Sequence, residues 1–331
     1  MSRLAVIGSG SWGTALARVL APRFDRVGLW AYEADLAGRM AASRENDLFL
    51  PGFPLPANVG PTSQLGEALD GAAIVLSVVP SQHVRGVFAR MLPYLRPDQC
   101  FVSATKGLEL GTLLRMTEVI REVTVPAFEP SLAVLSGPTF AREVAAGEPA
   151  AIVVASEARA VASRIQRAFS GPALRLYANA DPVGVEFGAA LKNVIAIAAG
   201  ICEGLELGSN SRAALITRGL AEITRLAVAA GGNPLTLAGL AGLGDLVLTC
   251  TGELSRNRRV GIELGRGRPL AEIISSMRMV AEGVKTTEAA LALAERLSVD
   301  LPIAQQVAAV FAGRSPREAL RELMDRSLKS E

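Results

Sequence analysis

The chain has 331 residues, enough for two domains with sizeable hydrophobic cores. Half of its residues are hydrophobic and a fifth are charged, and 34 basic against 32 acidic residues give a net charge of +2. This balance gives no sign of a nucleic-acid-binding or membrane-surface protein. The most apolar stretch, 194–202, is too short to span a bilayer, so no stable membrane insertion is expected.

Cysteine and histidine usage narrows the chemistry. The three cysteines, Cys100, Cys202 and Cys250, are far apart and form no C-x-x-C pattern. We therefore expect reduced structural thiols in a cytoplasmic protein. The chain enters its first predicted strand at once, so no signal peptide is expected. No metal site is predicted. The single histidine, His83, lies at a predicted helix start, where polar residues often cap the helix. Acid–base chemistry is then expected from Lys, Asp or Glu.

A glycine-rich turn opens the chain. The apolar run 4–7 precedes Gly8, Gly10 and Gly13, and the helix-forming run 14–20 follows them. A strand, G-x-G-x-x-G and a helix form the context of a dinucleotide-binding turn. In that fold Gly8 permits the tight turn and Gly10 lets the backbone approach a pyrophosphate, while Gly13 lets the helix pack closely. The alternative interpretation is a plain glycine-rich turn.

The first half of the chain alternates strands and helices, as in an α/β protein with a Rossmann-type doubly wound parallel sheet. Asp181 and Pro182, an acidic N-cap followed by proline, open a long helix, and helical patterns continue to the end of the chain. A capping box is predicted at 315–318. We predict a dinucleotide-binding domain over 1–180 and an all-α substrate-binding domain over 181–331. Further strands are predicted at 27–30, 72–80, 100–105, 132–135, 151–155 and 174–177, and a rigid loop at 51–56.

Several polar or small residues follow predicted strands, where ligands of open α/β sheets bind. Glu33 favours a free ribose 2′-hydroxyl, and therefore NAD, although it could equally be a surface charge. Arg39 could instead fold back toward the 2′-phosphate of NADP. Lys106 is the only charge between Asp98 and Glu109, and a solvated turn lysine is the alternative. The residues 136–141 suit close backbone approach to a ligand or form a simple turn.

The helix after Asp181 contains an isolated lysine. From Phe187 to Cys202 the only charge is Lys192, on a small and apolar helix face. Burying an unpaired ammonium is costly, and the usual response is a lowered pKa or a carboxylate partner. Lys192 is therefore a candidate general acid–base, with a lysine that reaches water as the alternative. Asp245, the only acidic or basic residue between Arg225 and Glu253, is its expected partner or else a helix N-cap.

Arginines gather at another predicted helix start. Ser255 has the features of an N-cap, which places Arg256 and Asn257 in the first helical turn. Cations at a helix N-terminus are unfavourable unless an anion docks there, and phosphate is the obvious one. The alternative is a solvated basic patch.

Taken together, these motifs resemble those of the bacterial NAD(P)-dependent glycerol-3-phosphate dehydrogenases over essentially the full length of the chain. The motifs that carry the resemblance occupy 8–15, 103–107, 136–141, 190–194, 244–246, 255–257 and 280–283. The resemblance implies that NADH or NADPH reduces dihydroxyacetone phosphate to sn-glycerol 3-phosphate, which feeds glycerophospholipid synthesis. Tyr32 departs from the basic residue or histidine often found at its position, which leaves the choice of NAD or NADP open.

The resemblance also assigns site residues, with Lys192 as the proton donor and acceptor at the substrate oxygen. The implied substrate-binding residues are Lys106, Gly137, Thr139, Lys192, Asp245, Ser255, Arg256 and Asn257. The cofactor-binding residues are Gly8, Gly10, Ser11, Trp12, Gly13, Tyr32, Lys106, Ala141, Arg256, Val280 and Glu282.

Hydride transfer from the nicotinamide to the ketone carbon leaves an alkoxide that needs a proton and a nearby positive charge, and Lys192 would supply both. One alternative is a reductase of another small hydroxyacid or hydroxyketone on the same plan. The other is a non-catalytic NAD(P)-sensing module whose helical half serves dimerisation, although such a sensor needs no proton donor. A homodimer is a possible assembly.

Overall fold

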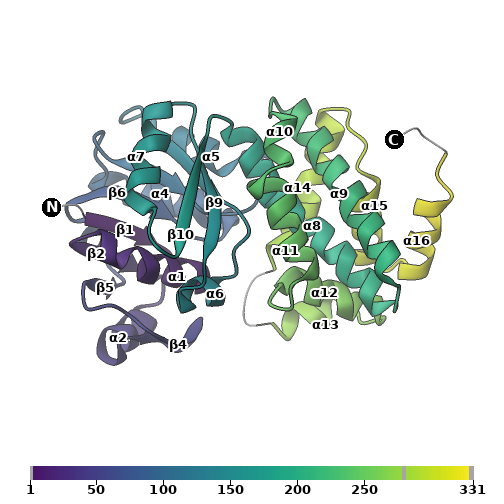
Figure 1. Cartoon of the computed structure of the whole chain (residues 1–331), viewed down its shortest axis with the longest axis horizontal. Coiled ribbons are helices and arrows are strands. Elements are labelled where there is room, and N and C mark those ends of the chain that lie inside the picture. Colours follow the sequence, from purple (N-terminus) through teal and green to yellow (C-terminus); the bar gives the residue numbers. More distant parts are fainter. Residues whose placement is uncertain (1–2, 278–280, 328–331) are drawn as a thin grey trace.

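The computed structural model describes residues 3–277 and 281–327, and it has a sheet-bearing half followed by a helical half (Figure 1). The main sheet has eight strands in the order β10-β9-β8-β7-β6-β1-β2-β5, and β3 pairs with β4 in a separate hairpin. The strands are β1 (Arg3–Ile7), β2 (Arg26–Trp30), β3 (Glu45–Asn46), β4 (Leu50–Pro54), β5 (Val59–Thr62), β6 (Ala72–Ser77), β7 (Cys100–Ser103), β8 (Ser131–Ser136), β9 (Ala150–Ala155) and β10 (Leu174–Asn179).

The doubly wound sheet is parallel, as predicted, except between β8 and β9, which are antiparallel. The connection between them, 137–149, forms α6 (Ala141–Ala146), which packs on α1 (Ser11–Leu20) instead of crossing the sheet. Antiparallel strands can be joined at one edge in this way, whereas parallel strands need a crossover. The predicted rigid loop at 51–56 is wrong in part, since β4 occupies most of it.

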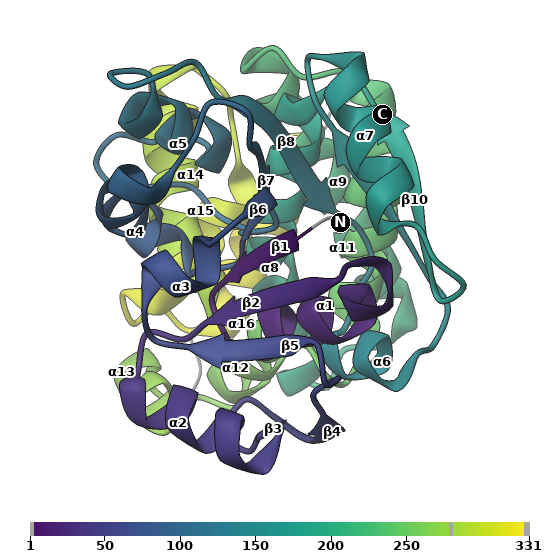
Figure 2. The same ribbon diagram turned by 90° about the vertical axis from the view of Figure 1, so that its left-hand side faces the viewer.

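Helices cover both faces of the sheet, as a doubly wound fold requires. Figure 2 shows α3 (Leu65–Leu69), α4 (Val84–Met91) and α5 (Met116–Thr124) on one side of the strands and α1 and α7 (Arg159–Phe169) on the other. This half also contains α2 (Ala34–Ser43) and the short 3₁₀ turns η1 (Ala21–Arg23), η2 (Ser81–His83) and η3 (Leu92–Tyr94).

From Pro182 onward the elements in the described part of the chain are helical, as the sequence pattern predicts. They are α8 (Pro182–Gly204), α9 (Ser209–Ala229), α10 (Pro234–Leu237), the π-helical turn η4 (Leu240–Gly244), α11 (Asp245–Thr251), α12 (Arg256–Gly265), α13 (Leu270–Ser275), α14 (Glu282–Arg296), α15 (Pro302–Phe311) and α16 (Pro316–Met324). Ser315 occupies the N-cap of α16 but makes no side-chain cap bond, contrary to the predicted capping box.

The long helix α8 lies at the centre of the helical half. Asp181 caps it as predicted, because its carboxylate accepts a hydrogen bond from the Gly184 backbone N–H at 2.8 Å. By length and composition alone α8 could cross a membrane, because its apolar region extends well beyond the stretch 194–202. Its apolar window is 94% buried inside the protein, which is what the core helix of a globular domain requires.

Glycines bring α8 and α12 into close contact. A Cβ added at Gly261 would lie 2.0 Å from the Ile197 carbonyl oxygen, and one at Gly200 would lie 2.0 Å from the Arg258 carbonyl oxygen. Neither position can carry a side chain without moving the backbone. This contact holds the arginine-bearing start of α12 against the helix that carries Lys192.

Candidate active site

The glycine turn after β1 has the geometry of an anion-binding turn. Gly8 has a φ of +115°, and a Cβ there would lie 2.8 Å from the Val78 carbonyl oxygen. A Cβ at Gly13 would lie 1.8 Å from the Gly8 carbonyl oxygen, whereas nothing lies within 4 Å of a Cβ at Gly10. Gly8 and Gly13 therefore permit the turn, and Gly10 leaves open space before the start of α1. This open backbone fits a dinucleotide pyrophosphate.

Other predicted cofactor residues surround this turn. The Ser11 hydroxyl donates to the Phe49 carbonyl oxygen at 2.6 Å, and Trp12 packs in the same apolar cluster as Ala141. The buried Trp12 indole N–H has no hydrogen-bond partner within the described residues, an exception to the usual satisfaction of buried donors. Tyr32 lies just beyond β2 with 72% of its surface exposed.

At the predicted ribose position, Glu33 is exposed. Arg39 forms ion pairs with Asp35 at 2.9 Å and with Asp47 at 3.1 Å. Two carboxylates therefore hold the Arg39 guanidinium, which the sequence places within reach of a ribose 2′-phosphate.

The structure brings three predicted site residues together in one buried cluster. The Lys192 Nζ contacts one carboxylate oxygen of Asp245, and the Lys106 Nζ lies 2.9 Å from the other. Exposed fractions of the side chains are 5% for Lys192, 0% for Asp245 and 17% for Lys106. The alternatives are therefore wrong for all three residues. Lys192 does not reach water, and Lys106 is not a solvated turn lysine, because both pair with Asp245. Asp245 is not a helix cap, since Gly244 occupies the N-cap.

The surroundings of Lys192 suit proton transfer near neutral pH. Burial lowers the pKa of Lys192 to about 7, the Asp245 carboxylate opposes this shift, and the positive charge of Lys106 adds to it. The ammonium donates to Asp245 and, at 2.9 Å, to the Thr249 hydroxyl. A lysine ammonium has three N–H donors, and the described residues accept from two of them, so one remains for a substrate oxygen.

Sequence reasoning missed Thr249 as a partner of Lys192. Thr249 lies four residues after Asp245 and therefore shares its helix face, a spacing that could have identified it. Its hydroxyl also donates to the Asp245 carbonyl oxygen at 2.6 Å, which fixes the orientation of the oxygen that accepts from Lys192.

The start of α12 separates its arginines by role. Ser255 is the N-cap, as predicted, and its hydroxyl accepts from the Arg258 backbone N–H at 3.2 Å. The Arg258 guanidinium is paired with Glu203 at 2.6 Å. Arg256 makes no hydrogen bond or ion pair in the described part of the chain, and part of its surface is exposed to solvent. The protein atoms around it partly desolvate its guanidinium. This desolvation lowers the pKa of Arg256, and Glu282 opposes the shift.

Asn257 connects α12 to two other helices. Its amide N–H donates to the Asn193 side-chain oxygen at 3.0 Å, and its own oxygen accepts from the Gly283 backbone N–H at 3.0 Å. Asn193 directly follows Lys192, and sequence reasoning gave it no role of its own. Asn257 therefore aligns the neighbourhood of Lys192 with the start of α14, whatever else it binds.

Glu282, a predicted cofactor residue, joins the two halves of the molecule. The Ser81 hydroxyl, just beyond β6, donates to the Glu282 carboxylate at 2.7 Å, and burial raises the pKa of that carboxyl group.

His83 is exposed at the start of α4 and makes no cap bond, contrary to its expected role. Val280, also predicted to contact the cofactor, lies outside the described residues.

The loop after β8 contains two predicted substrate residues. Gly137 has a φ of +153°, and a Cβ there would lie 2.9 Å from the Ile152 Cα. The Thr139 hydroxyl donates to the Gly137 carbonyl oxygen at 3.2 Å. Thr139 lines a cavity together with Leu248 of α11, the helix that carries Asp245.

Among the residues with described positions, no group of three or more His, Cys, Asp or Glu side chains could hold a metal ion.

Comparison with known proteins identifies the family. The models of the NAD-dependent glycerol-3-phosphate dehydrogenase N-terminus and C-terminus match residues 3–162 and 181–321. The chain belongs to the NAD-dependent glycerol-3-phosphate dehydrogenase family. It is 61% identical to a glycerol-3-phosphate dehydrogenase [NAD(P)+] of Koribacter versatilis, over 100% of this chain and 99% of the relative. A relative of the same name from Citrifermentans bemidjiense is 56% identical, over 99% and 98%.

Solved structures agree with this assignment. The glycerol-3-phosphate dehydrogenase of Coxiella burnetii matches 98% of this chain and 99% of its own, with a TM-score of 0.93 and 41% identity. The predicted family, the Rossmann-type half followed by a helical half, and the use of NAD or NADP are confirmed.

Proposed function

We propose that this glycerol-3-phosphate dehydrogenase family member interconverts dihydroxyacetone phosphate and sn-glycerol 3-phosphate with NADH or NADPH. The observation that carries the proposal is the buried Lys192–Asp245–Lys106 cluster, with a free N–H donor on Lys192 and a pKa lowered toward neutrality. A group with such a pKa can donate and accept a proton at the pH of the cell. The product would serve glycerophospholipid synthesis.

The chain's own residues would divide the work between cofactor and substrate. The turn of Gly8, Gly10 and Gly13 would hold the pyrophosphate at the start of α1, and the bound dinucleotide would exchange a hydride with the substrate carbon. The other residues proposed to hold the dinucleotide are Ser11, Trp12, Tyr32, Lys106, Ala141, Arg256, Val280 and Glu282.

On the substrate side, Lys192 would hold and transfer the proton at the substrate oxygen. The two lysine charges would stabilise the alkoxide that develops there, and Asp245 would keep both ammonium groups in place. Gly137 and Thr139 would bind the substrate from the loop after β8.

The phosphate end of the substrate would bind at the start of α12. Ser255 and Asn257 would bind there with Arg256, whose guanidinium makes no ion pair in the described part of the chain and carries the charge that a phosphate requires. The helix N-terminus adds to that charge.

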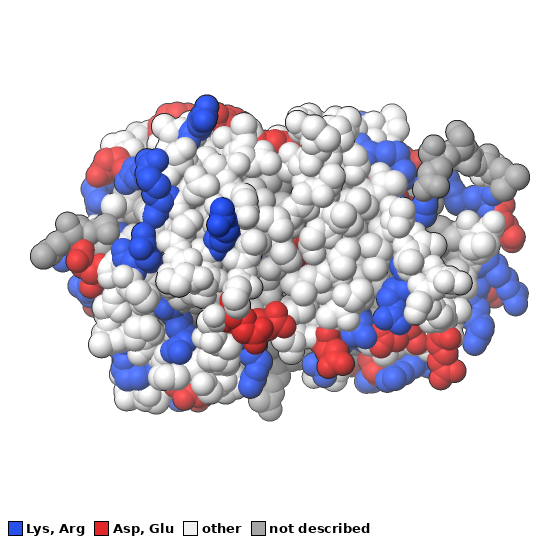
Figure 3. Space-filling view, in the orientation of Figure 1, with Lys and Arg blue, Asp and Glu red and all other residues white. Residues whose placement is uncertain are grey.

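Two further expectations belong to this proposal. The three cysteines are unpaired, which supports a cytoplasmic location. A homodimer is supported by a broad face largely free of charged side chains over α9, α10 and α11 (Figure 3), where Leu235 is 79% exposed.

Initial rates of NADH and NADPH oxidation test the function. We expect turnover with dihydroxyacetone phosphate and little with unphosphorylated 2- and 3-oxoacids. Arg256→Ala should raise KM for dihydroxyacetone phosphate by roughly 10- to 100-fold, and far less for unphosphorylated dihydroxyacetone. Arg259→Ala, an exposed arginine of the same helix, is the matched control. Equal effects of Arg256→Ala on both substrates would contradict a phosphate site at Arg256.

A further inference from the structure

The buried length of α8 carries a second charged residue besides Lys192. Glu186 is 4% exposed, and its carboxylate accepts from the Arg115 guanidinium at 2.7 Å. It also accepts from the Thr117 backbone N–H at 2.9 Å and from the Thr117 hydroxyl at 2.6 Å. All these donors come from the start of α5, in the sheet-bearing half. The proposed reaction does not use them.

Arg115 and Lys106 are the two ends of one bridging segment, residues 106–115, which connects β7 to α5. Lys106 at its start pairs with Asp245 on α11, and Arg115 at its end pairs with Glu186 on α8. Between these ends, Leu108 is fully buried in the core of the helical half. One short piece of the sheet-bearing half therefore holds the helical half at two points.

The bridging segment is internally fixed, so its two ends move together. Leu108 and Arg115 form an antiparallel bridge. The Gln82 amide donates to the Leu108 carbonyl oxygen at 2.7 Å and accepts from the Leu110 backbone N–H at 2.9 Å. The Glu118 carboxylate holds the Arg115 guanidinium at 2.8 Å. A displacement at Arg115 would therefore reach Lys106.

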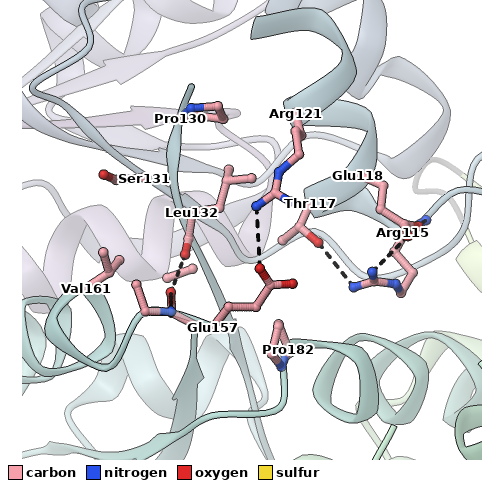
Figure 4. Close-up of a pocket in the computed structure, with 13 residues that line it drawn as sticks. Arg115, Thr117, Glu118, Arg121, Pro130, Ser131, Leu132, Glu157, Val161 and Pro182 are labelled. Atoms are coloured by element: carbon pink, nitrogen blue, oxygen red, sulfur yellow. Dashed lines mark hydrogen bonds and ion pairs between the residues drawn. The ribbon is translucent and has the colours of Figure 1, made fainter. Parts of the chain in front are cut away.

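A cavity lies beside the start of α8. Figure 4 shows Arg115 and Thr117 beside a cavity, with Pro182, the first residue of α8, also on its wall. The cavity has a volume of about 180 Å³. Open space next to the ion pair gives the start of α8 room to shift when the pair is lost.

We propose that Arg115 and Glu186 are positioning residues for the reaction, because their ion pair sets where Lys106 and Lys192 meet at Asp245. This inference rests on the proposed function. Lys192 lies six positions after Glu186, about 9 Å along the helix, so a tilt of α8 at Glu186 moves the ammonium. A displacement of about 1 Å at a reacting group can lower a rate roughly 100-fold.

The proposal also has a pH signature. Lys192 faces Asp245, Thr249 and Cys250 of α11 and Lys106 of the bridging segment. The charge of Lys106 contributes to the lowered pKa of Lys192. When the bridging segment moves away, that pKa rises, and the loss of ketone reduction with increasing pH occurs at a higher pH.

Glu186→Gln keeps the size of the side chain and an acceptor for Thr117 but removes the charge. We expect kcat for dihydroxyacetone phosphate to fall by roughly 10- to 100-fold, with the pH profile displaced upward. Arg115→Lys, which keeps the charge, should retain most of the wild-type kcat. Glu222→Gln is the matched control, because Glu222 is a buried glutamate that also accepts backbone N–H groups but lies wholly within the helical half.

If Glu186→Gln does not fold, the double variant Arg115→Met/Glu186→Gln replaces the pair without leaving a buried charge unpaired. We expect the double variant to be stable and still low in kcat. Wild-type kcat and an unshifted pH profile in either variant would overturn the inference, as would an equal loss in Glu222→Gln. An inactive wild-type chain would instead overturn the proposed function.

Discussion

Two buried charge clusters on α8 lie six residues apart, and they differ in how their charges balance. At Lys192, two ammonium groups share one carboxylate, that of Asp245. At Glu186, two carboxylates, those of Glu186 and Glu118, hold one guanidinium, that of Arg115. The first cluster has a surplus of donors, whereas the second has a surplus of acceptors.

This difference separates chemistry from alignment. Burial, together with the charge of the second lysine, lowers the pKa of Lys192, and an N–H donor is left for a ligand, so the first cluster can exchange a proton. An arginine stays protonated, and its fork geometry fixes direction, so the Arg115 guanidinium holds its partners in place without exchanging a proton. The same helix can therefore carry a reactive group and the anchor that aims it.

The largest expected effect comes from removing the reactive side of this comparison. Lys192→Ala should lower kcat by at least ~10²–10⁴, because both the proton donor and a charge at the developing alkoxide are lost. Binding of NADH, followed by its fluorescence, should be retained. Lys285→Ala, an exposed lysine of α14, is the control. A near-normal kcat for Lys192→Ala would remove Lys192 from the chemistry.

A smaller effect is expected when the lysine cluster loses only its neutral partner. Thr249→Val removes the hydroxyl that accepts from the Lys192 ammonium and stabilises its charged form. The pKa of Lys192 should then fall further. Since reduction needs the protonated amine, the decline of kcat with rising pH should begin at a lower pH, opposite in direction to Glu186→Gln. Profiles of kcat against pH measure both shifts, and a shift in the same direction for the two variants would contradict this scheme.

The smallest effect on turnover is expected at a third buried carboxylate, which belongs to neither cluster. Glu222 accepts from the Ile303 backbone N–H at 2.6 Å, and burial raises its pKa to about 7 from an ordinary value of 4.5. Between these two values the folded chain binds more protons than the unfolded chain, so stability declines as pH rises.

Glu222→Gln should therefore gain stability relative to the wild type between pH 5 and pH 8, with kcat unchanged. Thermal unfolding of both proteins across this range measures the difference. Parallel curves would show that the ionisation of Glu222 does not contribute.

Local sequence determined the features that need only neighbouring residues. The glycine turn, the Asp181–Pro182 helix start and the Ser255 cap were predictable because turn and cap geometry depend on a few successive residues. The isolation of Lys192 and Asp245 among apolar residues also indicated that they meet, since buried opposite charges need each other.

Only the tertiary structure decided what depends on contacts between distant segments. It reversed β9 relative to β8, gave Asp245 a second lysine, and paired Arg115 with Glu186 across 71 positions of the chain. Strand direction, the second partner of a carboxylate and the anchor of a helix arise from packing. The physical reason is that sequence shows which groups must be satisfied on burial, whereas only the folded chain shows which groups come close enough to satisfy them.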